Sequence, residues 1–121
     1  MESPKLMPRV LAASAMIGAR VRNHAGENLG KIDELMVDLD SGRIAYAVLS
    51  FGGFLGLGDK LFAIPWGALV LDEDEKVFIL NVERELLENA PGFDKDDWPD
   101  MTDQRWGTDI HSYYGVRPYW E

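Results

Sequence analysis

The amino-acid sequence predicts a mainly β protein, a small β-barrel with one short helix and an aromatic-rich C-terminal extension packed on it. Short apolar runs alternate with glycine-containing turns between residues 14 and 92, as expected for consecutive antiparallel strands. Three of these runs are apolar on both faces, so both faces need a cover. Six of the thirteen aromatic residues follow Phe93, and this composition is atypical of a disordered tail.

The length of 121 residues suits one domain with a single core. We expect three segments: a lead-in at 1–13, a barrel domain at 14–92 and the extension at 93–121.

The first predicted hairpin places a short strand around Val21 and a turn at 24–28. In the second strand, the period of two is broken by Asp33 and Glu34, which predicts a bulge there. With that bulge, the interior face would contain Ile32, Leu35 and Val37, and Met36 would lie on the opposite face.

The next turn, Asp40-Ser-Gly42, leads into a third strand at 43–51 that is apolar on both faces. Two further such strands are predicted at 61–66 and 77–82. A helix of one or two turns is expected at 83–89, and Pro91-Gly92 ends it.

Two interpretations of the extension remain open: it packs on the outer faces of the barrel, or it reaches another subunit. We favour packing within the chain, with a homodimer formed in addition through the exposed glycine-rich loop. The candidate interaction residues are Phe54, Leu55, Leu57, Trp98, Trp106, Tyr113, Tyr114 and Trp120.

Composition and charge exclude several classes of function. The net charge is −9, and residues 51–121 carry fifteen acids and six bases, so we expect no nucleic-acid binding. No stretch approaches the roughly 20 apolar residues of a spanning helix, so we expect no direct membrane insertion. The absence of cysteine agrees with a cytoplasmic protein.

The sequence contains no complete motif for catalysis or for binding a metal or a cofactor. Gly53–Gly58 has the glycine spacing of a phosphate loop, but Asp59 precedes Lys60 and a strand follows. The 38–42 turn begins like a calcium loop, yet its closing position is Leu49, so its aspartates indicate ordinary turn chemistry. The only imidazoles are His24 and His111. We therefore predict a protein that is not an enzyme and binds neither metal nor cofactor.

One family shows the same ordered pattern of strands and turns. The residues are Ile17-Gly-Ala-Arg-Val-Arg-Asn23, Gly26-Glu-Asn-Leu-Gly-Lys-Ile32, Val37-Asp-Leu-Asp-Ser-Gly-Arg-Ile44, Ala47-Val-Leu-Ser50 and Ala63-Ile-Pro-Trp66. In these segments the chain resembles the PRC-barrel domains, which occur in the photosynthetic reaction-centre H subunit and in the ribosome-maturation factor RimM. The resemblance implies a docking module and supplies no catalytic residues.

Two functional hypotheses follow. The first is a non-catalytic interaction module that docks on an unknown protein partner and self-associates. The alternative is a small-ligand-binding protein with a pocket between barrel and extension, walled by Trp66, Trp98 and Trp106.

Overall fold

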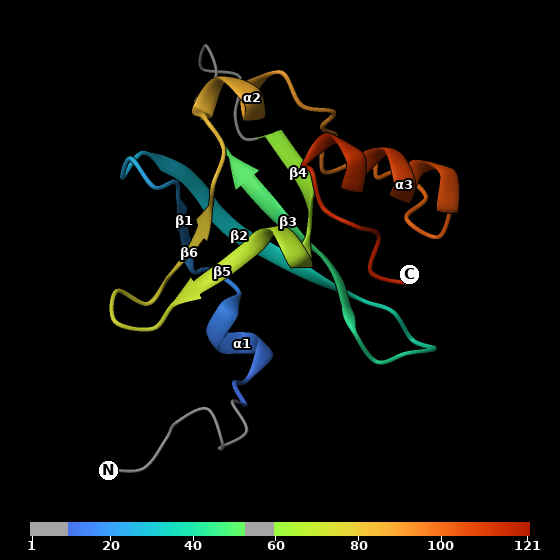
Figure 1. Cartoon of the computed structure of the whole chain (residues 1–121), viewed down its shortest axis with the longest axis horizontal. Helices are drawn as coiled ribbons and strands as arrows, with labels where there is room; N and C mark the ends of the chain where they lie inside the picture. The colour runs from blue at the N-terminus through green and yellow to red at the C-terminus, as the bar shows by residue number, and fades with distance from the viewer. Residues whose placement is uncertain (1–9, 53–59) are drawn as a thin grey trace.

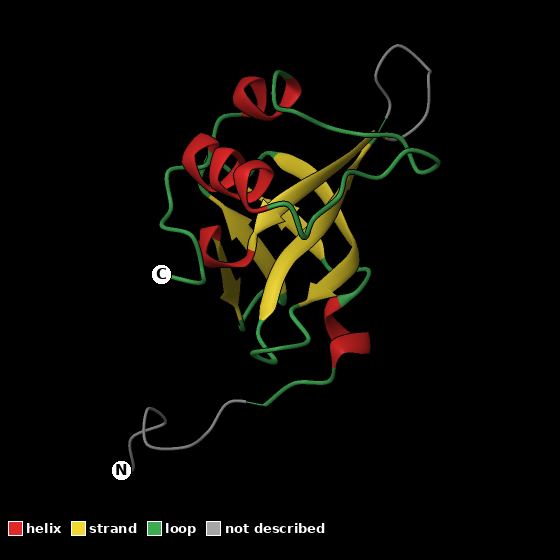
Figure 2. Ribbon diagram, turned by 90° about the vertical axis from the view of Figure 1, so that its right-hand side faces the viewer, coloured by secondary structure: helices red, strands yellow, loops and turns green. Residues whose placement is uncertain are grey.

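The computed structural model describes residues 10–52 and 60–121, which fold into one curled six-stranded sheet with short helices around it (Figures 1 and 2). The strand order is β4-β3-β2-β1-β6-β5. Neighbouring strands are antiparallel except β1 and β6, which are parallel. The strands are β1 (Arg20–Arg22), β2 (Asn28–Val37), β3 (Ile44–Phe51), β4 (Lys60–Pro65), β5 (Leu69–Asp72) and β6 (Val77–Leu80).

The predicted bulge in β2 is confirmed. The pairing of β2 with β3 shifts between Ile32 and Glu34, and Ile32 is buried. The prediction for Val37 is wrong, because a second shift after Met36 leaves Val37 52% exposed. Leu35 and Met36 are both half-buried and both pack against the core, so the two residues do not separate into an inner and an outer position.

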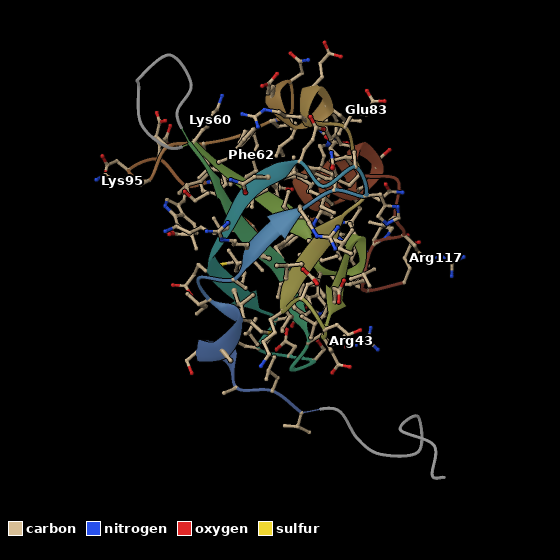
Figure 3. All side chains as sticks on the ribbon, turned by 90° about the vertical axis from the view of Figure 1, so that its left-hand side faces the viewer. Arg43, Lys60, Phe62, Glu83, Lys95 and Arg117 are labelled. Carbon is tan, nitrogen blue, oxygen red and sulfur yellow. The ribbon has the colours of Figure 1, made fainter. Side chains whose placement is uncertain are left out.

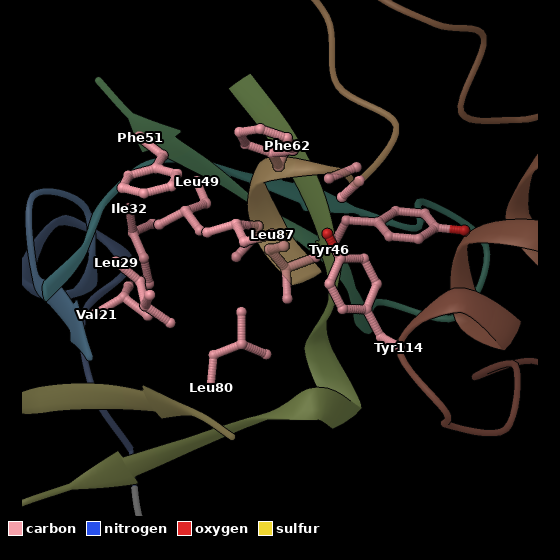
Figure 4. Packing of buried hydrophobic residues seen from close by; sticks show 14 of the residues in the cluster. Val21, Leu29, Ile32, Tyr46, Leu49, Phe51, Phe62, Leu80, Leu87 and Tyr114 are labelled. Atoms are coloured by element: carbon pink, nitrogen blue, oxygen red, sulfur yellow. The ribbon is translucent and has the colours of Figure 1, made fainter. Parts of the chain in front are cut away.

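The prediction that β3 is covered on both faces is confirmed, since every residue after Ile44 in this strand is buried. On one face Leu49 lies opposite Phe62, and Figure 4 shows both side chains in the barrel interior. On the other face Tyr46 and Val48 lie opposite Pro65 and Ala63, and the C-terminal extension covers this side.

The strand predicted at 61–66 is β4, and a 3-10 helix, η3 (Trp66–Ala68), follows it. Sequence reasoning missed β5, whose four residues lie between η3 and the acidic turn that starts at Glu73. Such a short strand gives almost no alternation to detect. The strand predicted at 77–82 is β6, which ends two residues earlier at Leu80.

Three α-helices complete the described fold: α1 (Ala13–Met16), α2 (Arg84–Glu88) and α3 (Gln104–Tyr113). α2 is the short helix predicted at 83–89. Its Leu87 is fully buried and lies in the interior near Leu49 and Leu80 (Figure 4), whereas Leu86 is exposed.

The extension packs on the barrel, as predicted. It begins with a bridge to β4, in which Phe93 and Leu61 exchange two backbone hydrogen bonds of 2.8 and 3.0 Å. It then forms α3, a helix that sequence reasoning did not predict. Asp103 caps α3 by accepting a hydrogen bond from the Arg105 amide, and the helix buries Ile110 against the sheet. In Figures 1 and 2, α3 lies beside β4 and β3.

Candidate functional sites

The predicted interaction residues occupy different environments. Phe54, Leu55 and Leu57 lie outside the described residues. Trp98 is 40% exposed, whereas Tyr114 is buried in the core. The other three, Trp106, Tyr113 and Trp120, are half-buried.

Trp106 and Trp120 belong to an aromatic cluster around the buried Tyr46, which we call the Tyr46 cluster: Tyr46, Trp106, His111, Tyr119 and Trp120. The Tyr46 ring centroid lies 5.2 Å from that of Trp106 and 5.4 Å from that of His111, in edge-to-face geometry. Burial raises the pKa of Tyr46 to about 12. The cluster therefore joins the extension to the sheet, and Trp106 and Trp120 have a structural role in it.

Helix α3 reaches the cluster at Gly107. A Cβ at this position would lie 2.7 Å from the Tyr46 hydroxyl oxygen and 2.9 Å from the Trp120 ring, so the absent side chain permits close packing. His111 is buried with its Nδ1 2.7 Å from the Gly107 carbonyl oxygen, whereas Asp109 and Ser112 are exposed. These three residues do not form an acid, imidazole and hydroxyl array.

A second contact fastens the C-terminal end to the turn between β2 and β3. The Tyr119 hydroxyl donates to Asp38 Oδ2 at 2.6 Å, and Arg43 Nη1 donates to the Tyr119 carbonyl oxygen at 2.8 Å. The hydrogen bond from Tyr119, followed by those from the Ser41 and Asp40 amides, lowers the pKa of Asp38. Desolvation and the bond to Asp38 raise the pKa of Tyr119 to about 12.

The interpretation of Asp38 as ordinary turn chemistry is confirmed for Oδ1, which accepts from the Asp40 amide at 2.9 Å. The partner of Oδ2 lies 81 residues away in sequence. No local pattern could have identified Tyr119.

A cavity of about 420 Å³ opens between β4 and the extension, and we call it the Trp98 cavity. Its lining includes Lys60, Phe93, Asp94, Asp97, Trp98 and Trp106. Two of the three tryptophans predicted to wall such a pocket are present. Trp66 is not among the lining residues and lies in a different groove. The cluster of aspartates between Phe93 and Trp98 is the sequence signal that could have found this site.

That second groove, of about 730 Å³, lies between the N-terminal segment and the sheet, and we call it the α1 groove. Its lining includes Val10, Leu11, Met16, Trp66, Leu71 and Phe78. Val10 is 90% exposed and Leu11 is 51% exposed. Sequence reasoning assigned these two residues to a lead-in without a role.

Charged side chains such as Lys60, Lys95 and Arg117 project outward around the barrel (Figure 3). Within residues 10–52 and 60–121, no group of three or more histidines and carboxylates is arranged to hold a metal ion. In the same ranges, no helix is long and apolar enough to cross a membrane.

Comparison with known proteins identifies the barrel. A family model described as the PRC-barrel domain matches residues 8–87. The chain belongs to the PRC-barrel family. The matched region contains all six strands and most of α2, while the bridge at Phe93, α3 and most of the Trp98 cavity lie beyond it.

Among solved structures, the PRC-barrel chain is similar to RimM of Pseudomonas aeruginosa, which is described as a 16S ribosomal RNA processing protein. The identity is 18% and the TM-score is 0.43. The match covers 69% of this chain and 50% of the RimM chain, so this chain spans about half the length of that structure. A comparison with curated proteins finds no match.

Proposed function

We propose that this PRC-barrel protein is a non-catalytic protein-interaction module that self-associates through the α1 groove. The observation that carries the proposal is the exposure of apolar side chains on the segment that lines this groove, above all Val10 and Leu11. Exposed apolar side chains next to an apolar groove are typical of a surface that another protein covers.

A second copy of the chain is the partner that fits this surface. Val10 and Leu11 line the groove of their own chain and stay exposed, so a two-fold axis can place this surface of one copy against the same surface of another. Residues 1–50 hold six acids and six bases, so the N-terminal half is neutral although the net charge of the chain is −9.

Sedimentation velocity at increasing protein concentration tests the proposal. We expect a dimer at high micromolar concentration that Leu11→Glu converts to a monomer. Salt should strengthen the dimer, because it screens the repulsion between two chains of the same charge. The matched control is Leu39→Glu in the turn between β2 and β3, where the side chain is 93% exposed and outside the α1 groove.

Leu39→Glu should leave the dimer intact, and urea unfolding should show that both variants remain folded. A wild-type chain that stays monomeric at high micromolar concentration would contradict self-association. A dimer that Leu39→Glu disrupts and Leu11→Glu does not would place the contact elsewhere.

The Trp98 cavity favours small-ligand binding as a second candidate function. Its volume of about 420 Å³ and its aromatic and carboxylate lining are those of a pocket for a small polar group. Native mass spectrometry of the freshly purified protein would detect a retained small molecule, and retention would favour this second candidate.

A further inference from the structure

The Trp98 cavity is a feature of this chain's own extension. Of the lining residues that the structure describes, only Lys60 and Ala63 lie within the region 8–87 that matches the PRC-barrel family. The remainder come from residues 91–110. Whatever this cavity binds is therefore recognised mainly by residues outside the shared barrel.

The aromatic wall of the cavity is held in place before any ligand arrives. The ring centroids of Phe93 and Trp98 lie 5.1 Å apart. Trp98 Nε1 donates to the Lys95 carbonyl oxygen at 2.8 Å, while 40% of the residue stays exposed. A fixed, exposed indole is the best side chain for contact between a cation and a π face.

The wall is also fixed to the sheet. Phe93 is bonded to Leu61 through two backbone hydrogen bonds, and Gly92 permits the close approach that this bridge needs. A Cβ at Gly92 would lie 2.9 Å from the Leu61 carbonyl oxygen and 2.8 Å from Lys60 Cε. Such preorganisation lowers the entropic cost of binding.

Two lining carboxylates are available for a ligand. Asp94 and Asp97 are exposed, and neither side chain makes a hydrogen bond or an ion pair within the described part of the chain. The next two aspartates differ, because Asp100 accepts from Thr102 and Asp103 caps α3. Lys60 is the only basic residue in the described part of the lining, so this part holds two carboxylates and one ammonium group.

We propose that the Trp98 cavity binds an arginine side chain of a protein partner, with the guanidinium against Trp98 and the carboxylates of Asp94 and Asp97 as acceptors. A planar guanidinium stacks on an aromatic ring and donates to carboxylates at the same time, which the compact ammonium of lysine does less well. The proposal rests on the protein-interaction function above, and it names the chemistry of a partner other than a second copy bound at the α1 groove.

Titration of the full-length, isotopically labelled protein with a short capped Gly-Arg-Gly peptide tests the site by NMR. We expect shifts of the Trp98 indole N–H signal and of the amides from Asp94 to Trp98. The same peptide with citrulline in place of arginine is isosteric and uncharged, so it should cause no saturable shift. The corresponding lysine peptide should bind more weakly than the arginine peptide.

Variants that change the charge of the cavity test whether its carboxylates attract the ligand. Asp97→Asn should weaken binding of the arginine peptide, and Trp98→Ala should weaken it by about twofold to fivefold, the range of one exposed cation–π contact. Lys60→Gln should strengthen binding, because it removes the repelling ammonium group. Asp96→Asn is the matched control, since Asp96 is exposed and lies outside the cavity lining, and it should leave the affinity unchanged.

Each opposite outcome overturns the proposal. Equal binding of the citrulline or lysine peptide would exclude guanidinium recognition. Weaker binding of the arginine peptide after Lys60→Gln would show that the Lys60 ammonium group does not repel the bound guanidinium. Tighter binding of free ethylguanidine than of the peptide would indicate a small molecule rather than a protein. Sedimentation of the same variants separates the two proposals, because failure of arginine binding with an intact dimer rejects only this site.

Discussion

Gly30 shows how a single residue sets the course of the sheet. It has a φ of +109°, and a Cβ at this position would lie 2.1 Å from the Ser50 carbonyl oxygen of β3. β2 can therefore pass close to β3 only because the side chain is absent. Sequence reasoning identified Gly30 as part of the family pattern, but the contact with Ser50 comes from the pairing of β2 with β3.

We predict that Gly30→Ala lowers the free energy of unfolding by about 3 kcal/mol or more, at the upper end of ordinary point mutations. The loss has two causes, the left-handed φ and the collision with the backbone. Gly42→Ala is the matched control, because Gly42 has a φ of +76° and a Cβ there would have no neighbouring atom within 4 Å. Gly42→Ala should lower the free energy of unfolding by about 1–2 kcal/mol, the cost of a left-handed φ alone. Equal losses in urea unfolding would show that the contact with Ser50 has no energetic effect.

The contact between Asp38 and Tyr119 predicts how stability depends on pH. The pKa of Asp38 is lowered from 3.8 in the folded protein. The ionised carboxylate therefore stabilises the folded protein above pH 3.8, and this stabilisation is lost as the pH falls through the lowered pKa. The pKa of Tyr119 is raised from 10.0 to about 12, so the unfolded chain loses this proton first and stability falls as the pH rises from 10.

Melting temperatures across the pH range check this prediction. Tyr119→Phe removes the hydroxyl, so the variant should melt at a lower temperature near neutral pH. The difference from wild type should shrink at both acidic and alkaline pH. A difference that stays constant across the range would contradict the role of the hydrogen bond.

At the scale of elements, the predictable parts are those with strong local patterns. The interruption at Asp33-Glu34 locates the bulge of β2, and the doubly apolar run at 43–51 identifies β3 as a covered strand. The four residues of β5 are too few to show a period. The prediction for Val37 fails because the second shift, after Met36, arises from pairing with β3.

Helix α3 illustrates a different limit. Its cap, Asp103, is a recognisable start signal, but the helix has Gly107 in its interior, where glycine normally weakens a helix. The reason for this glycine is the Tyr46 side chain, which belongs to β3 and is invisible to local reasoning. The Trp98 cavity is predictable in outline from its tryptophans, yet Phe93 and the two carboxylates join it only because the bridge to Leu61 places them there.

At the scale of the whole molecule, the six-stranded sheet and the extension depend on each other. The interior of the barrel uses one face of β3 and β4, and the outer face contains Tyr46 and Ala63, which are both buried. Their cover is the extension, through Trp106 and Ile110. The barrel without this cover would expose an apolar face to water.

We predict that a chain ending at Pro91 aggregates or loses several kcal/mol of stability. The fragment lacks the Phe93 bridge, α3 and the Tyr46 cluster's C-terminal members, and truncating even one buried isoleucine such as Ile110 costs about 2–5 kcal/mol. Light scattering and urea unfolding provide the measurement. A chain ending at Val116 is the graded control, because it loses Tyr119 and Trp120 but keeps Ile110, and it should stay soluble with an intermediate stability. A 1–91 fragment as soluble and as stable as the full chain would show that the barrel needs no cover, and the outer face of β3 would then have to be buried in some other way.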